Sequence, residues 1–296
     1  MSTKASPKPV YEYDATTRDS WLIRFREIGQ YRYLLQSLVV RNLKARYKDS
    51  LLGVLWSLLN PLALMIVFTV VFSVLSGGAA PRQYPVFVLV GIIPWRFFAG
   101  SLMATSVSLT ESSGLVKKVY FPRELLPIAS LLTELVNFLL GFLILIVFLY
   151  IFGLGLTPYV LWVPLILLTQ LVFTLGLGLV LSAMTVFYRD VLMILDVVLQ
   201  AWFFLSPVFY SFETLFGETA TLLGVTFNPT QAMRWINPMA SIIDGYRTVL
   251  WGTVGSQGPT SMDPTFMLRT LVQSLIILVI GYYIFVRSEP LLGEKL

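Results

Sequence analysis

Six long apolar stretches constrain this 296-residue chain more than any other feature of its sequence. Each has about 20 residues or more, enough to cross the ~30 Å hydrocarbon core of a bilayer as a helix that rises ~1.5 Å per residue. Only 12% of the residues are charged, about half the share found in an ordinary soluble domain. We therefore expect an all-α integral membrane protein. Its six transmembrane helices are predicted over residues 51–75, 84–109, 125–152, 159–188, 191–210 and 266–286.

Lysine and arginine predict how these helices are oriented. If the N-terminus is cytosolic, the cytosolic segments hold 16 Lys and Arg residues and the opposite side holds four. Positive residues favour the cytosolic side of a membrane protein, so both termini are expected in the cytosol. The chain then divides into a cytosolic N-terminal segment, residues 1–50, and a six-span transmembrane domain, residues 51–296.

The outer loop between the last two spans, residues 211–265, is long and rich in proline, glycine and aromatic residues. It includes two moderately apolar pieces, residues 222–227 and 239–251, that are too short or too polar to span a bilayer. Short outer re-entrant helices fit these pieces, provided that protein covers their backbone groups. An ordinary folded loop is the alternative.

The N-terminal stretch 21–48 predicts a helix with one apolar and one basic side. The apolar side consists of Leu35, Val39, Leu43 and Tyr47, and the basic side of Arg41, Lys44 and Lys48. This pattern suits an amphipathic helix at the cytosolic membrane surface, although a helix packed against a protein partner would look alike. Arg46 falls on the apolar side, where its charge requires either a phosphate or the carboxylate of a neighbouring helix or partner.

Several kinds of chemistry are excluded. The chain has no histidine and no cysteine, which removes His-based metal sites, catalytic triads and thiol chemistry. It also has no GxxxxGK[ST] phosphate loop, so we expect no catalytic residue, no metal and no nucleotide hydrolysis in this chain. The ionisable residues expected to be buried in the spans are Arg96, Glu134 and Asp196. We interpret them as paired helix contacts rather than as a proton relay.

Aromatic residues gather in two clusters, around residues 95–98 and 202–212. Interfacial belts explain many Trp and Tyr residues near the ends of spans. The alternative is that some line a passage and stack on sugar rings. The candidates for channel lining are Trp95, Phe97, Phe98, Trp202, Phe203, Phe204 and Tyr210.

Five motifs resemble those of one known family. They are LVVRNLKARYKDSLLGVLW at residues 38–56 with Asn60-Pro61 after it, GIIPWRFF at 91–98, KKVYFPRE at 117–124, FYRD at 187–190 and WINPM at 235–239. In this order and topology they are similar to the polysaccharide-export permeases of the type-2 ABC exporter class. That branch exports O-antigen, capsule or teichoic-acid chains in bacteria.

The resemblance implies a transport subunit rather than an enzyme, located in the bacterial cytoplasmic (inner) membrane. Two copies of the chain would form the conduit for a lipid-linked polysaccharide, surrounded by membrane lipids and without a nucleic-acid partner. Two copies of an ABC ATPase subunit would bind Mg-ATP, and this chain would hold no cofactor.

The same resemblance assigns roles to two groups of residues. Candidates for binding the substrate's lipid pyrophosphate are Arg41, Lys44, Arg46, Lys48 and Gly53. Candidates for coupling to the ATPase are Glu111, Lys117, Lys118, Tyr120, Phe121, Pro122, Arg123, Glu124, Arg189 and Asp190.

Two other functions stay open from the sequence. A type-2 ABC exporter of a small hydrophobic drug or lipid would share the same architecture. A membrane-embedded glycosyltransferase or acyltransferase is a different class, and the lack of histidine and of an acidic DxD-type cluster counts against it. A phosphate-loop ATPase in the neighbouring reading frame would favour the transporters.

Overall fold

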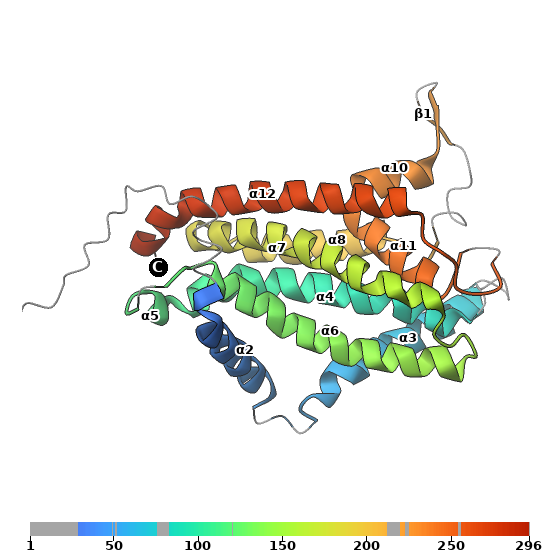
Figure 1. Cartoon of the computed structure of the whole chain (residues 1–296), viewed down its shortest axis with the longest axis horizontal. Coiled ribbons are helices and arrows are strands. Elements are labelled where there is room, and N and C mark those ends of the chain that lie inside the picture. The colour runs from blue at the N-terminus through green and yellow to red at the C-terminus, as the bar shows by residue number, and fades with distance from the viewer. Residues whose placement is uncertain are drawn as a thin grey trace, which may run out of the picture.

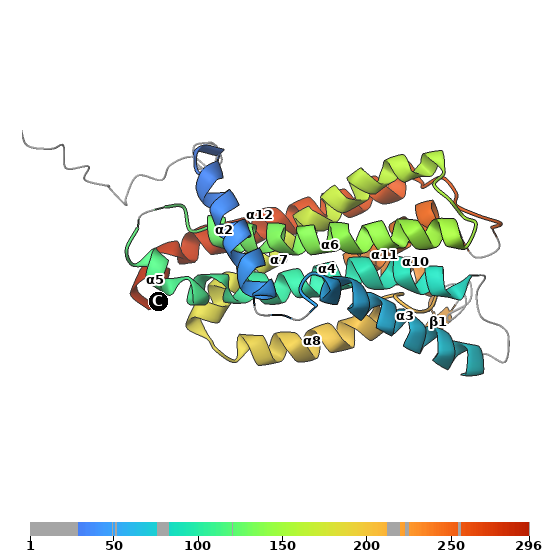
Figure 2. The ribbon, with the colours of Figure 1, turned by 90° about the horizontal axis from the view of Figure 1, so that it is seen from below.

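A computed structural model describes residues 29–48, 50, 52–75, 83–119, 121–211, 220–222, 225–253 and 256–295. These residues form an elongated bundle of helices, with a short hairpin and two short helices at one end (Figures 1 and 2). The prediction of a helical membrane protein is confirmed.

Within the described part of the chain, five helices are long and apolar enough to cross a membrane. They are α3 (Leu55–Leu75), α4 (Tyr84–Glu111), α6 (Leu125–Ile151), α7 (Val163–Phe187) and α12 (Pro264–Lys295). At ~1.5 Å per residue even α3, with 21 residues, reaches about 30 Å. They correspond to five of the six predicted spans.

The remaining predicted span, residues 191–210, is helical only as α8 (Val191–Leu205). Its 15 residues reach about 22 Å, less than the ~30 Å hydrocarbon core. The helix ends because Pro207 disfavours helical geometry in the residue before it, and Ser206 is extended with φ −106° and ψ 145°. Residues 206–211 then form a turn that packs back onto the bundle.

Helix α4 is the centre of the bundle, with contacts to α3, α6, α7, α8 and α11. Most of its first four turns are buried, and Val86 to Val90 are completely buried. Helices α7 and α12 approach closely because glycines face each other: a Cβ on Gly281 would collide with the carbonyl oxygen of Gly176. Such contacts are typical of membrane helices, where small residues allow close backbone packing.

Helix α2 (Arg32–Tyr47) crosses the bundle obliquely and packs against α6 (Figure 2). Its most buried side chain is Leu38, which joins an apolar cluster with Leu126 and Ala129 of α6. Leu35 and Val39, expected on the apolar side, are half-buried against the same cluster, so the packed face overlaps the predicted one and also includes Leu38. Helix α6 of the same chain therefore covers part of the apolar surface of α2.

The outer region differs from the prediction in one piece. Within the piece 222–227, for which a short helix or an ordinary folded loop was expected, the described residues instead lie in two antiparallel strands, β1 (Ala220–Leu222) and β2 (Val225–Phe227). β-branched Val225 and Thr226 favour this extended pairing. The second piece is helical and lies in α11.

The other elements of this region are η1 (Pro158–Trp162), α10 (Pro229–Ile236) and α11 (Pro238–Leu250). Helices α10 and α11 begin alike, because Asn228 and Asn237 each accept a backbone N–H bond and each is followed by proline. Nearly all of α11 is buried against α4 and α7.

Candidate functional site: a charged cavity between four helices

A cavity of about 590 Å³ lies between α2, α3, α4 and α6 and is lined in part by Arg46, Gly53, Arg96 and Glu134. Its volume falls in the range of ordinary ligand pockets. Trp56 and Phe97 supply aromatic walls, so the cavity combines charge with apolar surface.

Arg46 and Glu134 form an ion pair that joins the last turn of α2 to α6. Glu134 is almost completely buried, and Asn137 Nδ2 donates to its second oxygen, Oε2, at 3.3 Å. The hydrogen bond to Glu134 raises the pKa of Arg46. Of the two partners that the sequence left open for Arg46, the structure contains the carboxylate of a neighbouring helix.

The other pyrophosphate candidates take different positions. Gly53 lines the cavity in the turn between α2 and α3, where its φ of +47° favours glycine. Arg41 Nη2 donates to Ser112 Oγ at 3.3 Å and lines a second cavity of about 250 Å³. Lys44 and Lys48 are exposed. The structure thus brings Arg46 and Gly53 to the cavity, with Arg41 beside it.

Arg96 is the cavity residue that the sequence interpretation did not select. It lies near the middle of α4 and is exposed between buried neighbours. Its Nη1 donates to Oδ1 of Asn60 on α3 at 2.8 Å. The sequence contained a signal for Arg96, because a charged residue inside an apolar span indicates a functional role.

The channel-lining candidates mostly pack within the chain. Phe98 is fully buried and stacks on Phe173 with the ring centres 5.4 Å apart, and Trp202 lies nearly perpendicular to it with the ring centres 5.1 Å apart. Trp95 meets Phe203 edge-on at 5.6 Å. These rings connect α4, α7 and α8 and have a role in packing.

Three other aromatic candidates are placed differently. Phe97 lines the cavity, and Phe204 is 62% exposed on α8. The Tyr210 hydroxyl donates to the carbonyl oxygen of Phe204 at 2.8 Å. A channel-lining role stays a prediction, with Phe97 and Phe204 the best placed for it.

The coupling candidates before α6 follow α4 and the short helix α5 (Ser113–Val116). Glu111, Lys117 and Lys118 are exposed, whereas Phe121 and Glu124 are buried and Pro122 is half-buried. Arg123 Nη1 donates to the Glu289 carbonyl oxygen of α12 at 2.6 Å. Tyr120 lies outside the described residues.

Arg189 and Asp190, the other coupling candidates, are exposed in the turn between α7 and α8. This turn lies at the same end of the bundle as α5 and the C-terminus (Figures 1 and 2). The structure therefore brings both groups of coupling candidates to one end.

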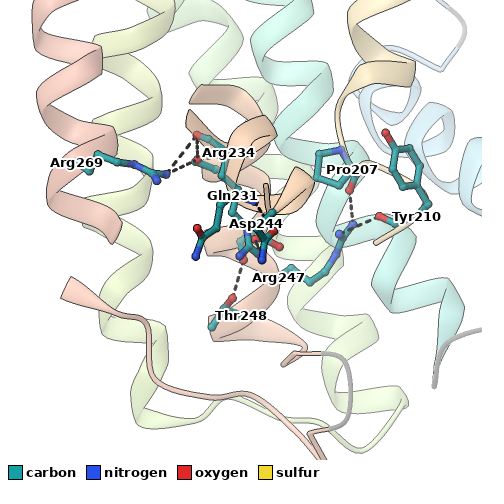
Figure 3. A network of polar contacts seen from close by, with 10 residues as sticks. Pro207, Tyr210, Gln231, Arg234, Asp244, Arg247, Thr248 and Arg269 are labelled. Atoms are coloured by element: carbon teal, nitrogen blue, oxygen red, sulfur yellow. Dashed lines mark hydrogen bonds and ion pairs between the residues drawn. The ribbon is translucent and has the colours of Figure 1, made fainter. Parts of the chain in front are cut away.

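The opposite end carries a second charged cluster, formed by α10, α11, α12 and the turn after α8 (Figure 3). Buried Arg247 donates to the carbonyl oxygens of Pro207 at 2.6 Å, Val208 at 3.1 Å and Tyr210 at 3.2 Å. Its guanidinium also lies 3.8 Å from the ring centre of Phe87. Arg247 thereby fixes the turn after α8 to the bundle.

The rest of this outer cluster is also closely connected. Arg234 of α10 forms an ion pair with Asp244 of α11. Arg269 of α12 donates to the Arg234 carbonyl oxygen at 3.3 Å and to Ser241 Oγ at 3.0 Å (Figure 3). We call Arg234, Asp244, Arg247 and Arg269 the outer lock.

Comparison with known families then identifies the chain. Residues 33–251 match the ABC-2 type transporter family. The chain belongs to this family. The matched stretch contains every residue that lines the 590 Å³ cavity, whereas α12 lies beyond it.

Among curated relatives, this ABC-2 transporter is 37% identical over 226 residues to the O-antigen export system permease protein RfbA of Myxococcus xanthus. That alignment covers 76% of the chain and 83% of the relative. It is 32% identical over 207 residues to the protein of the same name from Klebsiella pneumoniae, covering 68% of the chain and 78% of the relative. The resemblance to type-2 ABC export permeases that the sequence motifs indicated is confirmed.

Proposed function

We propose that this ABC-2 transporter is the membrane-spanning subunit of an exporter that moves O-antigen polysaccharide, attached to a lipid carrier, across the bacterial cytoplasmic (inner) membrane. The observation that carries the proposal is the similarity, over about four fifths of their length, to relatives named O-antigen export permeases. The family membership and the helical bundle support a transport subunit rather than an enzyme.

The cavity supports a lipid-linked anionic substrate over a small hydrophobic drug. It has a charged lining and aromatic walls, and the turn at Gly53 opens toward it. A diphosphate head group would compete with Glu134 for Arg46, whose planar guanidinium suits bidentate phosphate binding. The candidates Arg41, Lys44 and Lys48 would attract the anionic head group to this end by charge.

The proposed topology has six membrane crossings, with both termini cytosolic. Helix α8 supplies the sixth crossing together with the turn that follows it, and α10 and α11 are the short re-entrant helices. The distribution of basic residues supports this arrangement, because Lys117, Lys118 and Arg189 gather at the end that also holds the C-terminus. Helix α2 would lie at the cytosolic surface, with its packed face on α6 and its basic side toward lipid head groups.

Energy would come from separate ATPase subunits that bind Mg-ATP, two copies of which dock on two copies of this chain. The exposed residues Glu111, Lys117, Lys118, Arg189 and Asp190 are the contacts we propose for docking. Arg123 would carry movement into the bundle, since it joins this end to α12.

The test is reconstitution of the chain with the ATPase encoded beside it. We expect the two to co-purify, and ATP hydrolysis in nanodiscs to rise when lipid-linked O-antigen is added. Small hydrophobic amphiphiles are the control and should not raise it. Stimulation by the amphiphiles alone would favour the drug or lipid exporter, and turnover of the sugar chain without an ATPase would favour a transferase.

A further inference from the structure

We propose that Arg96, together with Asn60, forms a second binding station for the phosphate-bearing head group, deeper in the membrane than Arg46. The inference rests on the proposed function and deepens it. Arg46 would receive the anion at the cytosolic side, and Arg96 would hold it midway through the bundle during transfer.

The first observation is that the cavity is lined by unequal numbers of positive and negative side chains. Among its described lining residues, Arg46 and Arg96 are positive and Glu134 is negative, so the cavity carries an excess positive charge. The smaller cavity beside it differs, because its Arg41 and Arg46 are matched by Glu111 and Glu134. The excess charge therefore belongs to Arg96.

The second observation is the position of Arg96 along α4. It lies about 18 Å from the start of α4 and about 22 Å from its end at 1.5 Å per residue, and so near the middle of a membrane-spanning helix. An intramembrane arginine is costly unless it is paired, faces a cavity or marks a substrate pathway. Arg96 faces the cavity, and its hydrogen-bond partner Asn60 is neutral.

The third observation is that the two cavities adjoin each other along α4. Arg46 and Glu134 line both cavities, and so do Ala104 and Val107 of α4. The smaller cavity extends along α4 toward Ser112, and the larger one extends in the opposite direction past Arg96 to Ile93. Arg41, Arg46 and Arg96 thus follow one another from the α5 end toward the middle of the bundle.

A purely structural role for Arg96 gives a different expectation, which makes the inference testable. If Arg96 only fastens α4 to α3, Asn60→Asp should preserve or strengthen that contact by adding an ion pair. If Arg96 binds an anion, the new carboxylate neutralises it and repels the phosphate. Asn60→Ala removes the hydrogen bond without adding charge and is the matched control.

The experiment measures polymer export at equal membrane abundance for the unaltered chain, Asn60→Asp, Asn60→Ala, Arg96→Gln and Arg96→Lys. Binding of a polyprenyl pyrophosphate to the purified chain in nanodiscs is measured in parallel, with the polyprenyl alcohol as the phosphate-free probe. We expect Asn60→Asp and Arg96→Gln to lower export and pyrophosphate affinity about tenfold or more, with affinity for the alcohol unchanged. Asn60→Ala and Arg96→Lys should lose less than either.

The inference would be overturned if Asn60→Asp exports polymer as well as the unaltered chain and better than Asn60→Ala. That result would show that Arg96 makes a structural contact only. Should Asn60→Asp fail to accumulate, equal export by Arg96→Gln and Arg96→Lys would overturn it instead. The proposed function fails separately, if the unaltered chain with its ATPase exports no polymer.

Discussion

The cavity and the outer lock both contain arginines inside a membrane protein, but their surroundings differ. Arg247 is 3% exposed and has three backbone carbonyl oxygens and an aromatic ring as fixed partners. Arg96 is exposed to a cavity and donates to a neutral amide. An arginine whose guanidinium is held by fixed partners in the fold is structural, whereas one that faces a cavity with an excess of positive charge is available to a substrate.

The Arg46 side chain lies between these extremes. It is 41% exposed, and its partner Glu134 is 8% exposed. Glu134 holds Arg46 in place, yet the arginine keeps an accessible surface on the cavity. This arrangement suits a group that holds α2 on α6 at rest and that a phosphate can share.

The sharpest test of the comparison is whether the two regions lie on opposite sides of the membrane. Since the chain has no cysteine, Ser288→Cys at a half-buried position and Ser261→Cys at an exposed one each provide a unique thiol. With an impermeant thiol reagent on intact spheroplasts, we expect Ser261→Cys to be labelled and Ser288→Cys to be protected until the cells are opened. Labelling of Ser288→Cys in sealed cells would reverse the orientation of the bundle.

Replacing the buried arginine of the outer lock should have the largest effect on stability. Arg247→Met leaves three carbonyl oxygens without their donor, and we expect a loss of about 3 kcal/mol or more in the free energy of unfolding. Thermal unfolding in detergent measures it, with exposed Arg287→Met as the control, expected to change stability by less than ~0.5 kcal/mol. A similar, small change in both would show that the outer lock is not structural.

Breaking the pair between α2 and α6 should have a smaller effect. Glu134→Gln leaves Arg46 without its counter-charge, and we expect a loss of about 1–3 kcal/mol. The double variant with Arg46→Gln should recover part of this loss, because no unpaired charge is left. A double-mutant cycle on unfolding measures the coupling, and strictly additive losses would mean that the pair contributes nothing.

Polymer export should respond differently to changes at Arg46 and at Lys44, two basic residues close together on α2. We expect Arg46→Lys to reduce polymer export several-fold at matched expression, since lysine lacks the bidentate geometry for phosphate. Lys44→Ala removes an exposed charge worth only ~1 kcal/mol of attraction to anionic head groups and should export nearly as well as the unaltered chain. Equal export by both variants would contradict a specific phosphate contact at Arg46.

The smallest structural effect is expected at the exposed coupling residues. Lys117→Gln with Lys118→Gln should leave thermal stability within ~0.5 kcal/mol, because both side chains are exposed. Binding to the ATPase should nevertheless weaken, which pull-down of the ATPase at increasing salt measures. Replacing Phe121 or Glu124 is a poorer test, since both are buried and would disturb the fold. Unchanged binding at every salt concentration would remove Lys117 and Lys118 from the docking surface.

The sequence determined the membrane helices well, because crossing a bilayer requires a long apolar run that can be read locally. Five predicted spans agree with the helices within a few residues at most ends, although α12 extends beyond its prediction to Lys295. The span 191–210 was predicted too long, although Ser206-Pro207 is a local signal for the end of α8 at Leu205. The family resemblance was likewise carried by short motifs, and the comparisons bear it out.

Tertiary structure decided which side chains meet. Arg46 and Glu134 are 88 residues apart in the chain, and the acceptors of Arg247 lie 37 to 40 residues before it. A helical wheel of α2 alone identified Leu35 and Val39 on the packed face but missed Leu38, because the full extent of that face depends on where α6 places its apolar residues. Periodicity and hydropathy are local properties, whereas the pairing of charges depends on the distances between helices, which only the folded bundle sets.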